Sequence, residues 1–313
     1  MSKGSLRTFY SMDVSTLKTV CSSEWQKGGA SILAASVQIK TTIQKALETN
    51  SGAIIGRHGT IEFNVVQRPV DKDQWFTLER NAGVFPRTPE SVGEWVKDYK
   101  AAAAAADVMA VGWHEPIAEA EWAYLKSVNP KAFLCPLRAL EAYYVSTTNS
   151  WLRALDDQKV AVVSSFADTM FKQVVWLPEI WAGREDMLPR NVSWSFIRSY
   201  YSPALARGSC DWPHPVYSWK DAVDYMELEV LATGARVCLV GCGGLAMPLA
   251  LRLKRKGIIC IVLGGAVQLL FGIKGRRWEK HGEISKLFNC EWAVPALHEI
   301  PHGANQVEGG CYW

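Results

Sequence analysis

The sequence has no apolar run as long as the roughly 20 residues that a membrane-spanning helix needs. Residues 258–273 come closest, but paired glycines and Gln268 interrupt them. The amino-terminal residues lead into polar sequence, so no signal peptide is predicted. These absences predict a soluble, cytoplasmic protein without a transmembrane segment.

Paired CxxC spacing is also missing, because the eight cysteines are scattered over the chain. We therefore expect all of them to be reduced thiols, as is usual in the cytosol. The formal net charge of +3 is small and does not indicate a nucleic-acid partner. Late basic residues such as Lys274, Arg276 and Arg277 suit either one anionic small ligand or a solvated face.

The 313 residues include 49% hydrophobic and 21% charged side chains, which are ordinary values for a globular protein. Short apolar segments alternate with segments at helical spacing. This pattern predicts an α/β, Rossmann-like fold with a mostly parallel, doubly wound sheet flanked by helices. We expect a single domain over 1–313, with a helical part at 1–50 and a C-terminal tail at 290–313 packed on it. The expected strands are 53–55, 107–111, 132–135, 159–163, 192–197, 237–240 and 258–263.

A strand, a glycine turn, a helix and a second strand follow one another in residues 235–265, which read ARVCLVGCGGLAMPLALRLKRKGIICIVLGG. This order is typical of a βαβ unit. Gly241, Gly243 and Gly244 allow a tight turn that brings a ligand close to the backbone, and the following helix directs unpaired N–H groups at the same place. The turn predicts a phosphate site, unless its glycines serve only close packing of strand and helix.

The same turn satisfies the relaxed dinucleotide pattern, Gly241-x-Gly243-x-x-Ala246. That pattern also requires an acidic residue about twenty positions later, which binds a ribose. The second strand instead ends at Gly264 and Gly265, with no Asp or Glu beside them. This absence disfavours NAD and weakens the case for S-adenosylmethionine.

A second stretch of interest closes the first expected strand and reads GRHGTIEF over residues 56–63. Ligands of open α/β sheets bind beyond the carboxyl ends of the strands, so this stretch is the second candidate site. Ser165 and Asp168 follow the fourth expected strand in the same way, and Trp113 follows the second. Structural alternatives exist for several candidates: Arg57 as an ion-pair partner, His58 as a packed ring, and Asp168 as a helix cap.

Residues 298–302, HEIPH, match the HExxH zinc pattern letter for letter. That pattern needs a continuous helix, on which histidines four apart share a face. Pro301 lacks an N–H group and disfavours helical angles at Ile300, so we expect the match to be accidental. The glycine-rich tail that follows ends in aromatic residues, and it either caps the site or packs on the surface.

Two stretches together resemble the GT-D type of glycosyltransferase, a family first grouped as a domain of unknown function. The family pattern Arg-x-Gly-Asp-x-Glu is similar to residues 57–62, RHGTIE, in which Thr60 stands in place of the family's Asp. The second resemblance consists of the late strand with its glycine turn, 237–250, and the strand that ends in glycine, 258–265.

The resemblance implies that a sugar moves from a UDP-sugar donor to a hydroxyl group of a glycan acceptor. In the family, the carboxylates of the D-x-E motif are associated with a divalent ion. The implied cofactor is therefore Mn²⁺ or Mg²⁺, with Glu62 as its ligand. Because Thr60 replaces the family's Asp, one of the usual oxygen ligands is absent. Either a metal is held weakly, or helix N-termini and basic side chains carry the charge instead.

Within this hypothesis Glu62 is the catalytic residue, as a metal ligand or as general base on the acceptor hydroxyl, and His58 and Asp168 are reserve bases. Arg276 and Arg277 stabilise the departing diphosphate. The residues expected to bind the donor are Gly56, Arg57, Gly59, Thr60, Trp113, Ser165, Gly241, Gly243, Gly244, Gly264, Gly265, Gln268, Arg276, Arg277 and Trp278.

The sequence leaves two other functions open. One is a Rossmann-type methyltransferase that binds S-adenosylmethionine at the glycine turn. The other is a non-catalytic module that binds nucleotide sugars. Among the fourteen tryptophans, Trp113, Trp181 and Trp278 are candidate platforms for sugar faces, and each also fits a position in the core.

Overall fold

The computed structural model describes residues 22–112, 117–202, 205 and 211–313. Its centre is a seven-stranded sheet in the order β3-β2-β1-β7-β6-β4-β5, and every pair of neighbouring strands is parallel. The fold class expected from the sequence is confirmed. The strands are β1 (Ala53–Arg57), β2 (Val108–Val111), β3 (Phe133–Pro136), β4 (Lys159–Ser164), β5 (Ser193–Arg198), β6 (Val237–Gly241) and β7 (Ile259–Val262).

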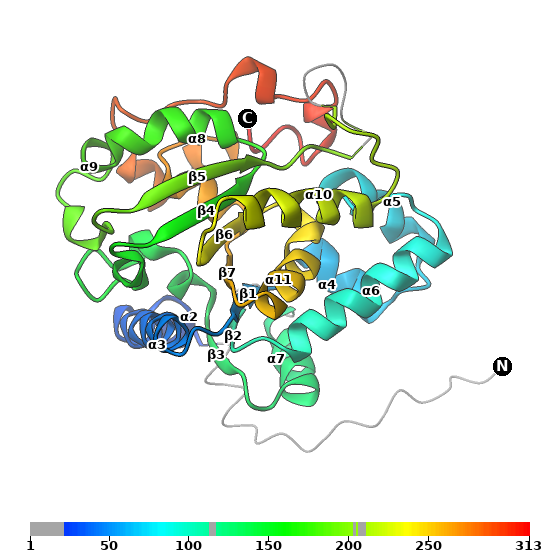
Figure 1. The fold of residues 1–313 in the computed structure, drawn as a ribbon, viewed down its shortest axis with the longest axis horizontal. Coiled ribbons are helices and arrows are strands. Elements are labelled where there is room, and N and C mark those ends of the chain that lie inside the picture. The colour runs from blue at the N-terminus through cyan, green and yellow to red at the C-terminus, as the bar shows by residue number, and fades with distance from the viewer. Residues whose placement is uncertain (1–21, 113–116, 203–204, 206–210) are drawn as a thin grey trace.

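Helices cover both faces of the sheet (Figure 1), with α6, α10 and α11 side by side on one face and α3 on the other. The α-helices are α2 (Ser23–Lys27), α3 (Gly29–Glu48), α4 (Thr60–Gln67), α5 (Lys72–Ala82), α6 (Pro89–Ala104), α7 (Ile117–Val128), α8 (Ala167–Gln173), α9 (Leu177–Ile180), α10 (Trp219–Ala232), α11 (Ala246–Arg255), α12 (Ala266–Leu270) and α13 (Arg276–Glu279). The 3₁₀ helices are η1 (Leu137–Ala139), η2 (Ala142–Tyr144), η3 (Trp151–Leu155), η4 (Val174–Trp176), η5 (Glu185–Met187), η7 (Gly243–Leu245), η8 (Ile284–Leu287), η9 (Leu297–Glu299) and η10 (Ala304–Gln306).

Alternate residues of the strands point into two hydrophobic cores, one on each face of the sheet. In β7, Ile259 and Ile261 join the core that includes α3, whereas Cys260 and Val262 join the core that includes α6, α10 and α11. Burial on both faces explains why the strands appear in the sequence as continuous apolar runs.

The observed strands begin and end within one or two residues of the expected positions, and the largest difference is in β1. β1 continues to Arg57, because Gly56 and Arg57 still pair with β2. The sequence also predicts that a helix begins at 140–145. It does not form, because Glu141 has ψ 83°, outside the helical region, and only the short η2 follows it. α11 ends at Arg255, and Gly257 follows it with φ 82°, a conformation that favours glycine.

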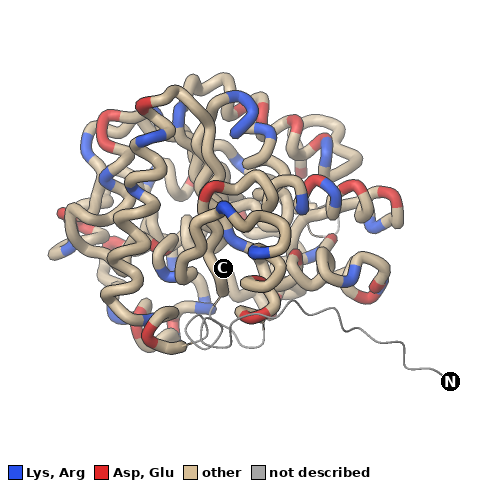
Figure 2. Tube along the Cα trace, turned by 90° about the horizontal axis from the view of Figure 1, so that it is seen from below, with Lys and Arg blue, Asp and Glu red and all other residues tan. Residues whose placement is uncertain are grey.

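Among the described residues, no helix has both the length and the apolar character of a membrane span. Lys and Arg alternate with Asp and Glu along the trace in Figure 2, and the charges of one sign do not gather on one side of that view. The carboxyl terminus lies within the outline of the molecule in both views, so the last residues pack against the body of the protein.

Candidate functional site

A pocket lies at the carboxyl edge of the sheet, the edge at which open α/β sheets bind their ligands. Its volume is about 280 Å³, and segments that follow β1, β7, β6, β4 and β5 line it. These strands are consecutive neighbours in the sheet, so turns that are far apart in the sequence meet in one place. In particular, Glu62 after β1 and Gly243 after β6 line the same cavity.

The early turn connects β1 to α4. Gly59 is the N-cap residue of α4, and Glu62 lies in the first turn of that helix. A Cβ atom at position 59 would overlap the Glu62 carboxyl group, so glycine here lets the Glu62 side chain keep its position against the backbone. Thr60, the first residue of α4, also lines the pocket, whereas Gly56 lies inside β1 and does not.

Arg57 and Glu62 determine the charge at this end of the pocket. Glu62 is 9% exposed, and burial raises the pKa of its carboxyl group, against the opposing effects of its own backbone N–H and of Arg57. Arg57 donates from Nε to the His58 carbonyl oxygen at 3.1 Å, and it forms no ion pair with any described residue. An unpaired guanidinium in a pocket lining is suited to an anion.

His58 is packed behind the pocket and is not part of its lining. Its buried ring stacks on Tyr99 and lies 5.1 Å from the ring of Phe63, and its Nδ1 lies 3.2 Å from the Tyr99 hydroxyl oxygen. Burial, together with the charge of Arg57, lowers the pKa of His58 to about 3. The imidazole is therefore neutral near pH 7, and it contacts Tyr99 rather than the cavity.

The late turn connects β6 to α11 through η7. Gly243 has φ 58°, and a Cβ atom there would lie 2.9 Å from the Ala82 carbonyl oxygen, so both the angle and the space require glycine. Gly241, Gly264 and Gly265 line the pocket beside it. Because α11 begins at the pocket wall, the positive end of its dipole lies next to the cavity.

Gly244, in contrast, is not part of the lining. Its carbonyl oxygen accepts a hydrogen bond of 2.8 Å from the indole N–H group of Trp95 on α6. A Cβ atom at position 244 would lie 2.7 Å from a methyl group of Val84. This glycine therefore allows close packing and does not form part of a ligand site, a possibility that the sequence leaves open for the glycines of this turn.

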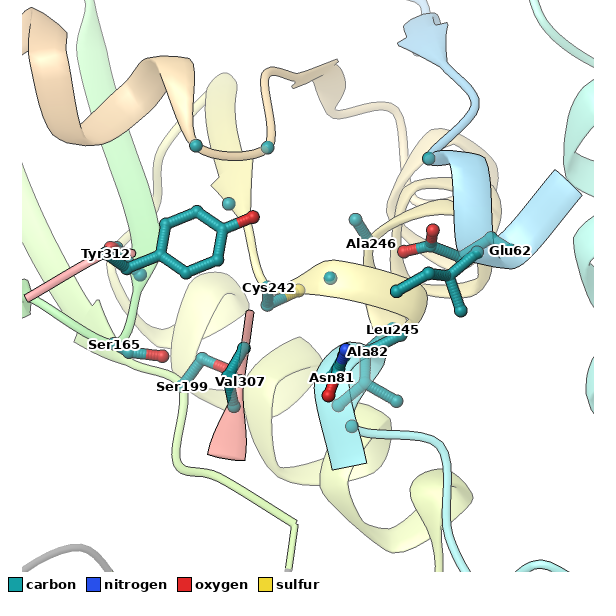
Figure 3. Close-up of a pocket in the computed structure, with 18 of the residues that line it drawn as sticks. Glu62, Asn81, Ala82, Ser165, Ser199, Cys242, Leu245, Ala246, Val307 and Tyr312 are labelled. Carbon is teal, nitrogen blue, oxygen red and sulfur yellow. The ribbon is translucent and has the colours of Figure 1, made fainter. Parts of the chain in front are cut away.

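The C-terminal tail closes one side of the pocket. Val307, Tyr312 and Trp313 line the cavity, and Figure 3 shows Val307 and Tyr312 beside Cys242 at its centre. Gln268 holds the tail in place, because its amide nitrogen donates to the Tyr312 carbonyl oxygen at 2.8 Å. The sequence allows the tail either to cap the site or to pack on the surface, and in the structure the tail caps the site.

Arg277 lies where the pocket meets the tail, and its positive charge is paired with a carboxylate of the protein. Its guanidinium forms an ion pair with the Glu308 carboxylate and donates to the Tyr312 hydroxyl oxygen at 3.0 Å. The same group lies 4.7 Å from the centre of the Tyr312 ring. Arg57 and Arg277 thus both line the pocket, but Arg277 has a carboxylate partner and Arg57 forms no ion pair within the described part of the chain.

Several expected site residues lie elsewhere. Arg276 is exposed and outside the pocket lining. Trp278 is buried, with its ring 6.1 Å from the ring of Tyr312. Trp181 is a core residue that stacks on a tyrosine and donates to the Leu270 carbonyl oxygen at 2.9 Å. Trp113 lies outside the described residues.

Asp168 lies outside the pocket lining, in a cluster with His298 and Glu299 whose potential ligand atoms are within 4.8 Å of one another. The buried Glu299 carboxylate accepts hydrogen bonds from the backbone N–H groups of Asp168 and Thr169 and from the Thr169 hydroxyl group, so it caps α8. The Asp168 carboxylate lies 2.8 Å from His298 Nε2. His302 lies beyond η9, so the HExxH match does not form a zinc-binding helix.

The pocket lining fits a divalent cation poorly. Among the described residues, its only carboxylates are Glu62 and Glu308. Glu308 is paired with Arg277, which leaves Glu62 as a single carboxylate for a cation. Mg²⁺ and Mn²⁺ bind to ionised carboxylates and other hard oxygen ligands, and Thr60 offers only a hydroxyl group where a second carboxylate is needed.

The sequence did not predict several residues of the lining. Arg80 and Asn81 end α5, and Tyr99 lies inside α6. Neither helix directly follows a strand, so the signal that identifies the glycine turns does not apply to them. Ser199 and Ser202 follow β5, and their position after a predicted strand was a signal that could have identified them.

No family model matches the sequence, and a search of curated proteins found no match. Two solved structures are similar to this one. The first is described as showing that "the highly conserved domain of unknown function 1792 has a distinct glycosyltransferase fold", with 11% identity and a TM-score of 0.39. The second is the selenomethionine-substituted structure of domain of unknown function 1792, with 10% identity and a TM-score of 0.40. Each comparison covers 86% of this chain and 96% of the other. The neighbours are thus of the kind that the sequence resemblance predicts, and we draw the function from the pocket itself.

Proposed function

We propose that the protein is a glycosyltransferase that moves a sugar from a UDP-sugar donor to a hydroxyl group of a glycan acceptor. The observation that carries this proposal is the single pocket that joins the unpaired Arg57, the glycine turns and Glu62. A cation and tight glycine turns suit a diphosphate, and a carboxyl group beside them suits proton transfer.

In this proposal the diphosphate lies over the turns that follow β7 and β6. Gly241, Gly243 and Gly264 allow phosphate oxygens to approach the backbone closely. Arg57 reaches the same place, because a Cβ atom at Gly264 would lie 3.5 Å from its guanidinium nitrogen. When the bond between sugar and diphosphate breaks, Arg57 stabilises the negative charge that develops on the leaving phosphate.

Glu62 is the proposed general base. The acceptor oxygen forms a bond to the anomeric carbon of the sugar, the bond to the diphosphate oxygen breaks, and the acceptor proton passes to the Glu62 carboxylate. A carboxyl group whose pKa is raised by burial is a stronger base than an exposed one. Asp168 and His58 take no part in this step, because neither lines the pocket.

We also propose that no protein-held Mn²⁺ or Mg²⁺ is needed. The carboxylates of the lining support this, since Glu308 is paired with Arg277 and Glu62 alone offers a hard cation only one carboxylate. Arg57 and the N-terminus of α11 supply positive charge at the glycine turns in place of a metal ion.

The test is the release of UDP from UDP-sugars, measured with and without a panel of glycan acceptors. Glu62→Gln cannot accept the proton, so we expect transfer to fall by about 10²- to 10⁴-fold while UDP still binds. Glu121→Gln is the matched control, because Glu121 is a second buried glutamate, 3% exposed, outside the pocket lining.

Other outcomes would contradict the proposal. Full activity of the Glu62→Gln variant would remove Glu62 from the mechanism. Binding of UDP without turnover on any acceptor would indicate a non-catalytic module, and binding of S-adenosylmethionine in place of UDP would indicate a methyltransferase.

A further inference from the structure

We propose that the nucleoside of the donor binds on the β5 side of the pocket, between the residues after β5 and the C-terminal tail. The sugar then lies toward Glu62. This inference rests on the proposed function and adds to it the direction in which the donor lies. It is drawn from three buried polar atoms, from the aromatic rings around them and from the order of the strands.

Three side chains of the pocket lining contain a buried polar atom without a hydrogen-bond partner in the described residues. These atoms are the hydroxyl oxygen of Ser202, the indole nitrogen of Trp313 and the amide oxygen of Gln268. Buried polar groups of folded proteins are nearly always paired, because an unpaired group loses its hydration without compensation. Three such atoms around one cavity point to a ligand that supplies the partners.

The three atoms restrict the chemistry of that ligand. Gln268 offers only an acceptor, because its amide nitrogen already donates to the carbonyl oxygens of Lys274 and Tyr312 at 3.0 and 2.8 Å. The Trp313 indole offers only a donor, and the Ser202 hydroxyl offers either. The ligand must therefore present both donors and acceptors. A uracil base has an N–H group between two carbonyl oxygens, and its ribose adds hydroxyl groups.

The surroundings on this side are aromatic and nearly neutral. The Trp313 ring lies 5.9 Å from the ring of Tyr201 and 6.0 Å from that of Tyr312. Aromatic side chains bind nucleobases by stacking. Arg277 and Glu308, which also lie here, neutralise each other in an ion pair. This environment suits an uncharged heterocycle better than a second phosphate.

The order of the strands gives the direction of the donor. Along the sheet edge, β1 carries Arg57 and Glu62, β7 and β6 carry the glycine turns, and β4 and β5 carry segments rich in hydroxyl groups. In Figure 3, Tyr312 and Ser165 lie on one side of Cys242 and Glu62 lies on the other. A nucleotide sugar has its diphosphate between nucleoside and sugar. The diphosphate lies at the central turns, and the sugar lies toward Glu62, the general base after β1. The nucleoside therefore lies toward β5.

The test uses two variants with matched controls. Ser202→Ala and Trp313→Phe each remove one of the unpaired polar atoms, and the second keeps an aromatic ring. Ser150→Ala and Trp292→Phe make the same chemical changes at a hydroxyl group and an indole N–H group that are also buried and without partners, but lie outside the pocket lining. Thermal unfolding of each variant shows that it is folded.

Calorimetry then measures the binding of UDP, of inorganic pyrophosphate and of a UDP-hexose. We expect Ser202→Ala and Trp313→Phe each to weaken UDP about fivefold, the effect of one lost hydrogen bond, and to leave pyrophosphate unchanged. The control variants should bind all three ligands as the wild-type protein does.

Different failures have different meanings. If the two site variants bind UDP as tightly as the wild-type protein, the nucleoside does not lie there and the inference is wrong. The inference is equally wrong if the variants bind UDP normally but bind the UDP-hexose more weakly than the wild-type protein does, because this side of the pocket would then hold the sugar. If the wild-type protein binds neither UDP nor pyrophosphate, the proposed function itself fails.

Discussion

Trp95 and Tyr99 lie one turn apart on α6, and each contacts a different turn of the pocket. The Trp95 indole N–H group donates to the Gly244 carbonyl oxygen at 2.8 Å, and the Tyr99 hydroxyl oxygen lies 3.2 Å from His58 Nδ1. Their rings pack together at 4.9 Å. One helix face thus holds the early and the late turn at a fixed separation.

Trp95→Phe removes the indole donor and leaves the buried Gly244 carbonyl oxygen without it. We expect the free energy of unfolding to fall by about 1–3 kcal/mol, as measured by urea denaturation. Trp292→Phe is the control, because the Trp292 indole N–H group has no partner to lose in the described residues. Equal losses in both variants would show that ring size, and not the hydrogen bond, is responsible.

The neutral state of His58 predicts a pH dependence of stability. Burial lowers its pKa from 6.5 to about 3, so between these values the unfolded chain binds a proton that the folded protein does not. Stability therefore falls as the pH decreases through this window. Relative to His58→Phe, the wild-type protein should lose up to about 1.4 kcal/mol per pH unit below pH 6, measured by urea denaturation. A difference that does not vary with pH would contradict the assignment.

Glu121 predicts a dependence of the opposite sign. Burial raises its pKa from 4.5 to about 7, so the folded protein binds the additional proton in this range and loses stability as the pH rises through it. Glu121→Gln does not titrate, and its amide oxygen can still accept from the Gly112 N–H group, as Glu121 does at 2.7 Å. The wild-type protein should therefore become less stable relative to this variant between pH 4.5 and 7. If the unfolding free energies of the wild-type protein and of Glu121→Gln change equally over that range, the raised pKa of Glu121 is contradicted.

Glu299 is predicted to be a helix cap and not a metal ligand. Glu299→Ala should lower the free energy of unfolding by about 1–2 kcal/mol, because the N–H groups at the start of α8 lose their acceptor. Glu299→Gln retains an acceptor and should lose less. EDTA should leave the melting temperature of the wild-type protein unchanged. A decrease that added Zn²⁺ or Mn²⁺ reverses would identify the cluster with Asp168 and His298 as a metal site.

The sheet and its glycine turns could be predicted because their signals are local. β7 is a continuous apolar run ended by Gly264, and the turn at Gly241 and Gly243 stands between a buried strand and an amphipathic helix. A strand buried on both faces and a glycine at positive φ can each be recognised from the residues of their own segment, without knowledge of any other segment. The placement of Glu62 beside the late turn follows from the rule that ligands bind at the carboxyl ends of strands.

The remaining parts of the site depend on contacts between distant segments. Nothing near Tyr99 in the sequence indicates that α6 reaches both turns. The ion pair of Arg277 with Glu308 forms only because the tail folds back over the pocket, and Arg57 keeps a guanidinium group without an ion-pair partner in the described residues. Trp313 becomes part of the lining by the same fold-back. Such long-range packing is not encoded in spacing or composition.

The most direct test of the account is a calorimetric titration of UDP into the wild-type protein, Arg57→Met and Arg255→Met, all in EDTA. Arg255 is an exposed arginine at the other end of α11, away from the pocket lining. We predict that the wild-type protein and Arg255→Met bind UDP equally. Arg57→Met should bind it about 10- to 100-fold more weakly, the effect of losing hydrogen bonds to a charged group. Equal binding by Arg57→Met, or binding by the wild-type protein only after Mn²⁺ is added, would contradict the account.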